Sequence, residues 1–124
     1  MTDEIRQMRL DALKVLRIPL VPFGEPAPRT VKAWARESSG KLILVHSPPL
    51  PSYPWHPESY FDQAQRVAEA VGVDPDGPLP SWSLWRKSQT KYGANVNDLR
   101  QPTLADHPAE ALLRAALAAW EEKP

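Results

Sequence analysis

The residues best suited to binding chemistry lie in one stretch near the C-terminal end. Between Leu79 and Ala105 the chain carries four basic residues and one acidic residue, and the same stretch holds two tryptophans. A tryptophan exposed beside a cation can stack on a nucleobase or anchor a protein interface. The candidate binding residues are Trp82, Trp85, Arg86, Lys87, Lys91, Tyr92 and Arg100.

Strand geometry would divide this set between two faces. Side chains alternate along a strand, so Trp82 and Arg86 would point to one side while Trp85 and Lys87 point to the other. One tryptophan is then more exposed than its neighbour. The alternative is that both tryptophans pack in the core and the cations form an ordinary solvated rim, since small sheets often use aromatic side chains for packing.

The charge of the whole chain narrows the class of partner. The 124 residues include 15 basic and 15 acidic residues, which gives a net charge of zero and argues against a general polyanion binder. Between Pro57 and Pro78, however, there are five acidic residues and one basic residue. The sequence therefore predicts an acidic helical segment followed by a basic, tryptophan-rich one.

Residues for catalysis or metal binding are sparse. The chain has no cysteine, which excludes disulfides, a thiolate nucleophile and Cys-ligated metals. Its three histidines, His46, His56 and His107, do not have zinc-site spacing, and His107 with Glu110 fits the first turn of a helix. The phosphate-binding glycine loops and the Gly-x-Ser-x-Gly motif are not in the sequence. We expect no catalytic residue, metal or cofactor, although a triad of remote residues stays open.

Fifteen prolines divide the chain into candidate elements. A run of overlapping Pro-x-x-Pro spacings from Pro48 to Pro57 favours either a rigid connector or a polyproline II ligand, and we interpret it as a connector. The predicted elements are a helix over 3–17, a hairpin over 30–46, a connector over 47–57, a helix over 58–71, a strand region over 80–105 and a helix over 107–122.

Local signals set the ends of the three helices. Thr2 is a plausible cap for the first helix, and Pro19 ends it. Pro57 is expected to open the second helix and Gly72 to end it. In the third helix Asp106 is expected to cap and Pro108 to open.

Two β-prone regions lie between the helices. In the hairpin, 42–45 is continuously apolar and predicts a central strand, whereas the first strand alternates and places Trp34 on its half-exposed side. In the second region, residues 82–87 are β-prone, Tyr92–Asn95 gives a turn signal and Leu99–Leu104 is expected to return as a strand. Together the elements predict an α+β single-domain sandwich of about three helices and a mixed or antiparallel sheet of about four strands.

Two further segments carry a family pattern. The first is the proline-rich stretch Ser47–Tyr53 together with the helix Tyr60–Ala68, and the second is the closing helix. In the closing helix an Ala-x-x-Arg-Ala-Ala-Leu pattern is matched by Ala111, Arg114, Ala115, Ala116 and Leu117. These segments resemble the phage α-β-α sandwich domain family of small phage and prophage proteins. The resemblance implies an α/β sandwich in a phage setting and brings no catalytic residues.

The functional expectation combines this resemblance with the basic, tryptophan-rich stretch. We expect a small, non-enzymatic phage accessory protein in the cytoplasm that binds a host protein or protein–nucleic-acid complex. The resemblance suggests a host defence or host enzyme as the target. One alternative is a nucleotide-binding protein that uses the same cations, and another is a minor hydrolase. The sequence shows neither a signal peptide nor a membrane span, and the oligomeric state stays open.

Overall fold

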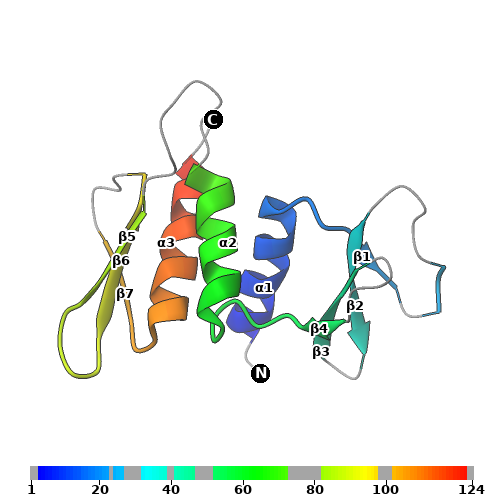
Figure 1. The fold of residues 1–124 in the computed structure, drawn as a ribbon, viewed down its shortest axis with the longest axis horizontal. Helices are drawn as coiled ribbons and strands as arrows, with labels where there is room; N and C mark the ends of the chain where they lie inside the picture. The colour runs from blue at the N-terminus through cyan, green and yellow to red at the C-terminus, as the bar shows by residue number, and fades with distance from the viewer. Residues whose placement is uncertain are drawn as a thin grey trace.

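Helices form the central layer of the protein, and a β-sheet lies on each side of it (Figure 1). The computed structural model describes residues 3–22, 24–26, 32–38, 41–46, 52–72, 82–97 and 102–122. The helices are α1 (Asp3–Val15), α2 (Phe61–Gly72) and α3 (Pro108–Glu122). The α+β class predicted from the sequence is confirmed.

The strands form two sheets. Sheet A has the order β1-β2-β3-β4 and consists of β1 (Leu20–Val21), β2 (Ala33–Ser38), β3 (Lys41–His46) and β4 (Tyr53–Pro54). Sheet B has the order β5-β6-β7 and consists of β5 (Trp82–Arg86), β6 (Tyr92–Val96) and β7 (Thr103–Ala105). Only β1 and β2 run parallel among the described pairs. Sheet A comes between α1 and α2 in the chain, and sheet B between α2 and α3.

The composition of α3 explains why the helices lie in the middle. Most of its circumference is apolar, and a helix of that kind is buried on several sides. Its buried residues are Ala109, Ala111, Leu112, Leu113, Ala115, Ala116, Leu117 and Ala119. The many alanines let α1, α2 and sheet B all approach α3 closely. The sequence suggested helices around one sheet, whereas the structure has helices between two.

Sheet B packs directly on α3 through small side chains. Ala94, Val96 and Ala105 are buried and belong to the same core as α3. The Thr103 hydroxyl also donates a hydrogen bond to the carbonyl of Ala111 in α3, at 2.9 Å. These contacts fix the inner face of sheet B and leave its other face turned away from the helices.

Sheet A is joined to the helices by the segment Trp55–Glu58, which we call the strap. The Trp55 side chain is fully buried, and its backbone N–H donates to the Leu42 carbonyl of β3 at 3.0 Å. Its indole N–H donates to the Arg9 carbonyl of α1, also at 3.0 Å. Glu58 accepts a hydrogen bond from Arg9 Nε at 2.9 Å in a buried ion pair. The strap thus connects β3 with α1.

The helix ends agree in part with the sequence signals. Helix α1 ends in a Schellman motif, because Ile18 N–H bonds to the Leu13 carbonyl and Arg17, with φ of 58°, bonds to the Lys14 carbonyl. The predicted cap Thr2 lies outside the described residues. Helix α3 begins at Pro108 as predicted. Its cap is His107, whose Nδ1 accepts from Ala109 N–H at 3.1 Å, so the assignment of Asp106 was wrong.

The prediction that Pro57 opens α2 was also wrong. The backbone N–H groups of Ser59 and Tyr60 bond to the His56 carbonyl in a separate turn, and α2 starts only at Phe61. Gln63 in the first turn holds this entry: it donates to the Pro54 carbonyl and accepts from His56 N–H. The reason for the late start is that Glu58 is directed inwards to Arg9.

The strand predictions hold better for sheet A than for sheet B. The hairpin is confirmed, with Trp34 opposite Val45 and Ala35 opposite Leu44, and β3 lies between β2 and β4. Trp34 is buried rather than half-exposed. In sheet B the predicted turn at Tyr92–Asn95 is strand β6, and the chain reverses at 87–91, where Lys87 N–H bonds to the Lys91 carbonyl.

Two predictions fall partly outside the described residues. Pro48–Pro51 of the connector and Leu99 of the predicted return strand are not described, while Thr103–Ala105 does form β7. Within the described part of the chain, no helix has the length and apolarity needed to cross a membrane.

Candidate functional site

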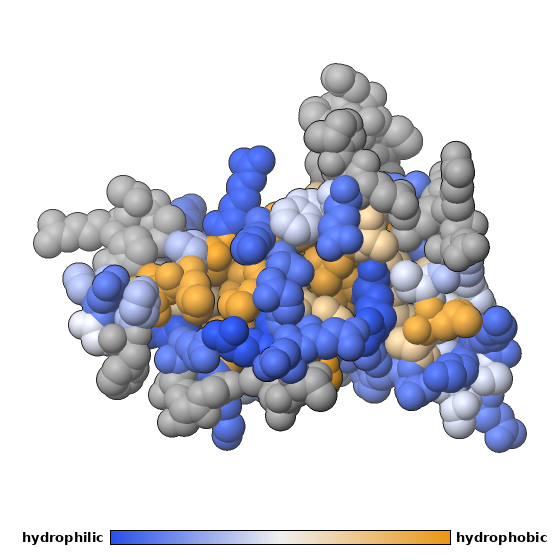
Figure 2. Space-filling view, turned by 180° about the vertical axis from the view of Figure 1, so that it is seen from behind, coloured by the Kyte–Doolittle hydropathy of each residue, from blue (hydrophilic) through white to orange (hydrophobic). Residues whose placement is uncertain are grey.

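The outer face of sheet B is the surface that carries the candidate tryptophan. By register Trp85 lies opposite Gly93, and Gly93 lies opposite Leu104, so the three form one row across the sheet. Trp85 is 39% exposed and Leu104 is 45% exposed. The space-filling view shows hydrophobic atoms at the surface among hydrophilic ones at the sheet B end of the molecule (Figure 2). We define the outer face by Ser83, Trp85, Gly93, Asn95 and Leu104.

The indole of Trp85 occupies the space beside Gly93 that a side chain at this position would fill. A Cβ atom built on Gly93 would lie 2.5 Å from the Cε2 atom of the indole, which is closer than such atoms approach. The indole therefore lies on the Gly93 backbone and covers it, since Gly93 is buried. A tryptophan on a strand backbone presents a flat, apolar and well-ordered ring to solvent.

The cations of the hairpin differ in how they are satisfied. Arg86 donates from Nε to the Ser88 carbonyl and from Nη2 to the Gln89 carbonyl, each at 3.2 Å. These carbonyls are neutral, so the guanidinium charge is not cancelled. Lys91 forms an ion pair with Asp106. Lys87 is exposed and has no carboxylate partner among the described residues.

The remaining predicted residues do not join the outer face. Trp82 and Tyr92 are half-buried and pack against the core. The Trp82 ring meets Phe61 of α2 edge to face, at 6.2 Å between ring centroids. Arg86 is on the same side of the sheet as Trp82, by the alternation of β5. Arg100 lies outside the described residues. The structure thus keeps Trp85 on the outer face, with Lys87 in the loop that follows β5, and places Trp82, Arg86 and Tyr92 on the other side of sheet B.

The predicted acidic segment has one buried carboxylate among its described residues, while Asp74 and Asp76 lie outside them. Glu58 is buried and paired with Arg9, so its charge is compensated inside the protein. In α2 the side chains of Asp62, Arg66 and Glu69 are exposed; Arg66 donates to the Tyr53 hydroxyl, and Glu69 accepts from Gln65.

Leu104 is the surface residue that sequence reasoning missed. The signal was present in the pattern Thr103-Leu104-Ala105, where small side chains flank a large one, as in a strand with one packed face. Pro102 and the short length of β7 made this pattern difficult to recognise as a strand in the sequence. The structure shows that Leu104 belongs to the same row as Trp85.

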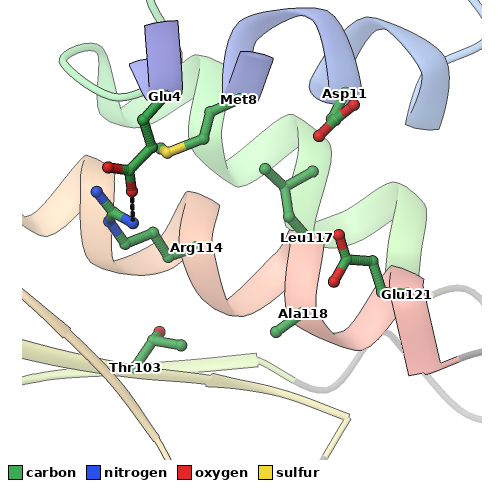
Figure 3. Close-up of a pocket in the computed structure, with 8 residues that line it drawn as sticks. All are labelled: Glu4, Met8, Asp11, Thr103, Arg114, Leu117, Ala118 and Glu121. Atoms are coloured by element: carbon green, nitrogen blue, oxygen red, sulfur yellow. Dashed lines mark hydrogen bonds and ion pairs between the residues drawn. The ribbon is translucent and has the colours of Figure 1, made fainter. Parts of the chain in front are cut away.

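A cleft of about 320 Å³ lies between α1, α3 and β7. Figure 3 shows Arg114 reaching Glu4 at one end, with Asp11 and Glu121 at the other. Arg114 Nη1 lies 2.7 Å from Glu4 Oε1, and Nη2 lies 3.0 Å from Glu110 Oε1. The hydrogen bond to Glu4 raises the pKa of Arg114, so the guanidinium stays charged at every working pH. The ion pair between Arg114 and Glu4 links α3 to α1.

The histidines serve separate structural roles. His56 Nδ1 lies 3.7 Å from Glu58 Oε1, and its ring meets Tyr60 edge to face. His107 caps α3. The side chain of His46 is not described. Among the described residues there is no group of three potential metal ligands.

Comparisons with known proteins do not add to this picture. No protein-family model matches the chain, and neither does any curated protein or solved structure.

Proposed function

We propose that this is a non-enzymatic binding protein whose outer face of sheet B docks on another protein. The observation that carries the proposal is the row of Trp85, Gly93 and Leu104. Its two large apolar side chains are exposed on the face of sheet B that the helices do not cover. Tryptophans in such positions contribute strongly to protein interfaces.

The surroundings of the row indicate the chemistry of the partner. Lys87, in the loop that follows β5, has no described carboxylate partner. Arg86 lies on the other side of sheet B, where it donates to the carbonyls of its own loop. Lys91 is compensated by Asp106. A complementary protein would have an apolar centre for Trp85 and Leu104 and an acidic rim beside the hairpin.

The setting of this interaction follows the family resemblance. A phage or prophage protein of this kind would act in the cytoplasm on a host protein or on a protein–nucleic-acid complex. Inhibition of a host defence or of a host enzyme is the activity that fits such a partner.

A nucleotide is the second candidate, because one indole face of Trp85 is open and cations are near. Base stacking on an exposed tryptophan is common in proteins that bind single-stranded nucleic acid. The hairpin supports this candidate less well. Arg86 is directed at its own loop, and Lys91 at Asp106, which leaves Lys87 as the cation best placed for a phosphate among the described residues.

The test begins with chemical cross-linking of the tagged protein in lysate of a candidate host. Each captured protein is then purified and titrated with the unchanged chain and with Trp85→Ala and Leu104→Asn. The matched control is Leu20→Asn, because Leu20 is also 45% exposed but lies on β1 of sheet A. A nucleotide panel is tested in parallel by thermal melts.

The proposal predicts a clear order of effects. Trp85→Ala should weaken binding to the purified partner by about 30-fold or more, as interface tryptophans do. Leu104→Asn should weaken it less and Leu20→Asn not at all. Equal binding by all variants would refute the proposal. A nucleotide-dependent rise in melting temperature that disappears in Trp85→Ala would favour the second candidate instead.

A further inference from the structure

An apolar cleft lies at the other end of the molecule, between α1 and β1. Its volume is about 440 Å³, within the range of sites that hold small molecules. Its lining residues are Gln7, Leu10, Leu13, Lys14, Ile18, Pro19 and Leu20. Figure 2 shows hydrophobic atoms at the surface here as well, between the sheet A end and the helices.

The cleft is built on a fixed turn of backbone. Leu13 and Ile18 are buried and are linked by the Schellman hydrogen bond of 2.9 Å that ends α1. This motif usually brings the same two side chains into contact. Leu20 forms the outer wall and is held in place by the pairing of β1 with β2, and by the bond from Ala35 N–H to the Pro19 carbonyl. The floor and the wall therefore exist before any ligand binds.

The polar edge of the cleft has a positive group. Lys14 is largely exposed, and its Nζ is 4.0 Å from Asp11 Oδ1, the outer limit for an ion pair. The Asp11 carboxylate also accepts a hydrogen bond of 2.9 Å from Gln7. A ligand carboxylate beside Lys14 could approach the ammonium group more closely than the Asp11 carboxylate does.

We infer that the cleft binds a short aliphatic carboxylate, with its chain between Leu13, Ile18 and Leu20 and its carboxylate at Lys14. This site lies on α1 and β1 and is independent of the outer face of sheet B. The apolar lining favours a hydrocarbon chain, and the ammonium favours a carboxylate over an uncharged or cationic head.

The test uses the full chain labelled with ¹⁵N and titrated with butanoate, hexanoate and octanoate below micelle concentrations. Saturable shifts should be confined to residues around the cleft. Affinity should rise roughly fourfold for each added methylene group, which is the transfer free energy of one buried methylene. This readout requires no variant, so a folding defect cannot confuse it.

Variants then separate the chain from the head group. Leu20→Asn should weaken octanoate binding at least tenfold, whereas Leu104→Asn, equally exposed on sheet B, should leave it unchanged. Lys14→Met should lower the affinity for octanoate until it equals the affinity for octanol. The affinity for octanol should stay unchanged. Shifts that do not saturate, shifts on sheet B, or octylamine binding as tightly as octanoate would overturn the inference.

Discussion

The two sheets are attached to the same helices by different kinds of interaction. Sheet B packs through Ala94, Val96 and Ala105 directly on the alanines of α3. Sheet A depends on the strap, where a buried indole and a buried ion pair connect β3 with α1. The comparison teaches that alternation in the sequence predicts apolar packing between neighbouring elements. It does not predict a polar connection between residues that are far apart in the sequence.

The difference also explains why the exposed apolar row lies on sheet B. In sheet A the inner strand β2 has a buried side chain on each face, since Trp34 and Ala35 point to opposite sides and both are buried. In sheet B the corresponding alternation gives half-buried Trp82 and exposed Trp85. Only the second arrangement leaves a large aromatic side chain available to a partner.

The largest loss of stability is expected from removing the buried ion pair of the strap. Arg9→Met leaves the Glu58 carboxylate in the core, where one oxygen, Oε2, already has no hydrogen-bond partner. We expect a loss of about 3–5 kcal/mol in the free energy of unfolding, measured in urea. Arg114→Met is the control, because its ion pairs are partly exposed and should cost no more than about 1 kcal/mol.

A smaller effect is expected from Gly93→Ala in sheet B. The new Cβ would force the Trp85 indole to move, and overpacking of this kind costs about 1–3 kcal/mol. The double variant with Trp85→Ala should recover most of that loss, which a double-mutant cycle measures. If Gly93→Ala were equally destabilising in both backgrounds, the close approach of the indole would not be its cause.

The substitution Trp55→Phe removes one hydrogen bond of the strap. It leaves the Arg9 carbonyl without the indole donor, and we expect a loss of about 1–2 kcal/mol in thermal or urea unfolding. Trp82→Phe should cost less, because Trp82 is half-buried and its described contact with Phe61 is one of ring edges. A larger loss at Trp82 would reverse the proposed roles of the two tryptophans.

The smallest effect compares two residues with left-handed backbone. Arg17→Gly should stabilise the protein by about 0.5–1 kcal/mol, because a long side chain is strained at φ of 58°. Asn97→Gly should give no gain. Asparagine tolerates this conformation, and its side chain donates to the Val71 carbonyl. Urea unfolding of each single variant measures both changes in the free energy of unfolding.

Much of the fold followed from local patterns. The apolar stripe of α3, its start at Pro108 and the pairing of β2 with β3 were predicted because they depend on neighbouring residues. The start of α2 was wrong, because Glu58 is held by a residue 49 positions away. Of the candidate site, strand alternation predicted that one of the two tryptophans is more exposed than the other. That the exposed one is Trp85 depended on which face of sheet B packs on α3. The contribution of Leu104 needed the register of a third strand.

The place of each sheet in the chain has a consequence for the order of folding. Because sheet A and sheet B each come from one contiguous stretch, their strand pairs close short loops at low entropic cost. The ion pair between Glu4 and Arg114 instead joins residues 110 positions apart. We therefore expect both hairpins to form early and the docking of α1 onto α3 to complete the structure.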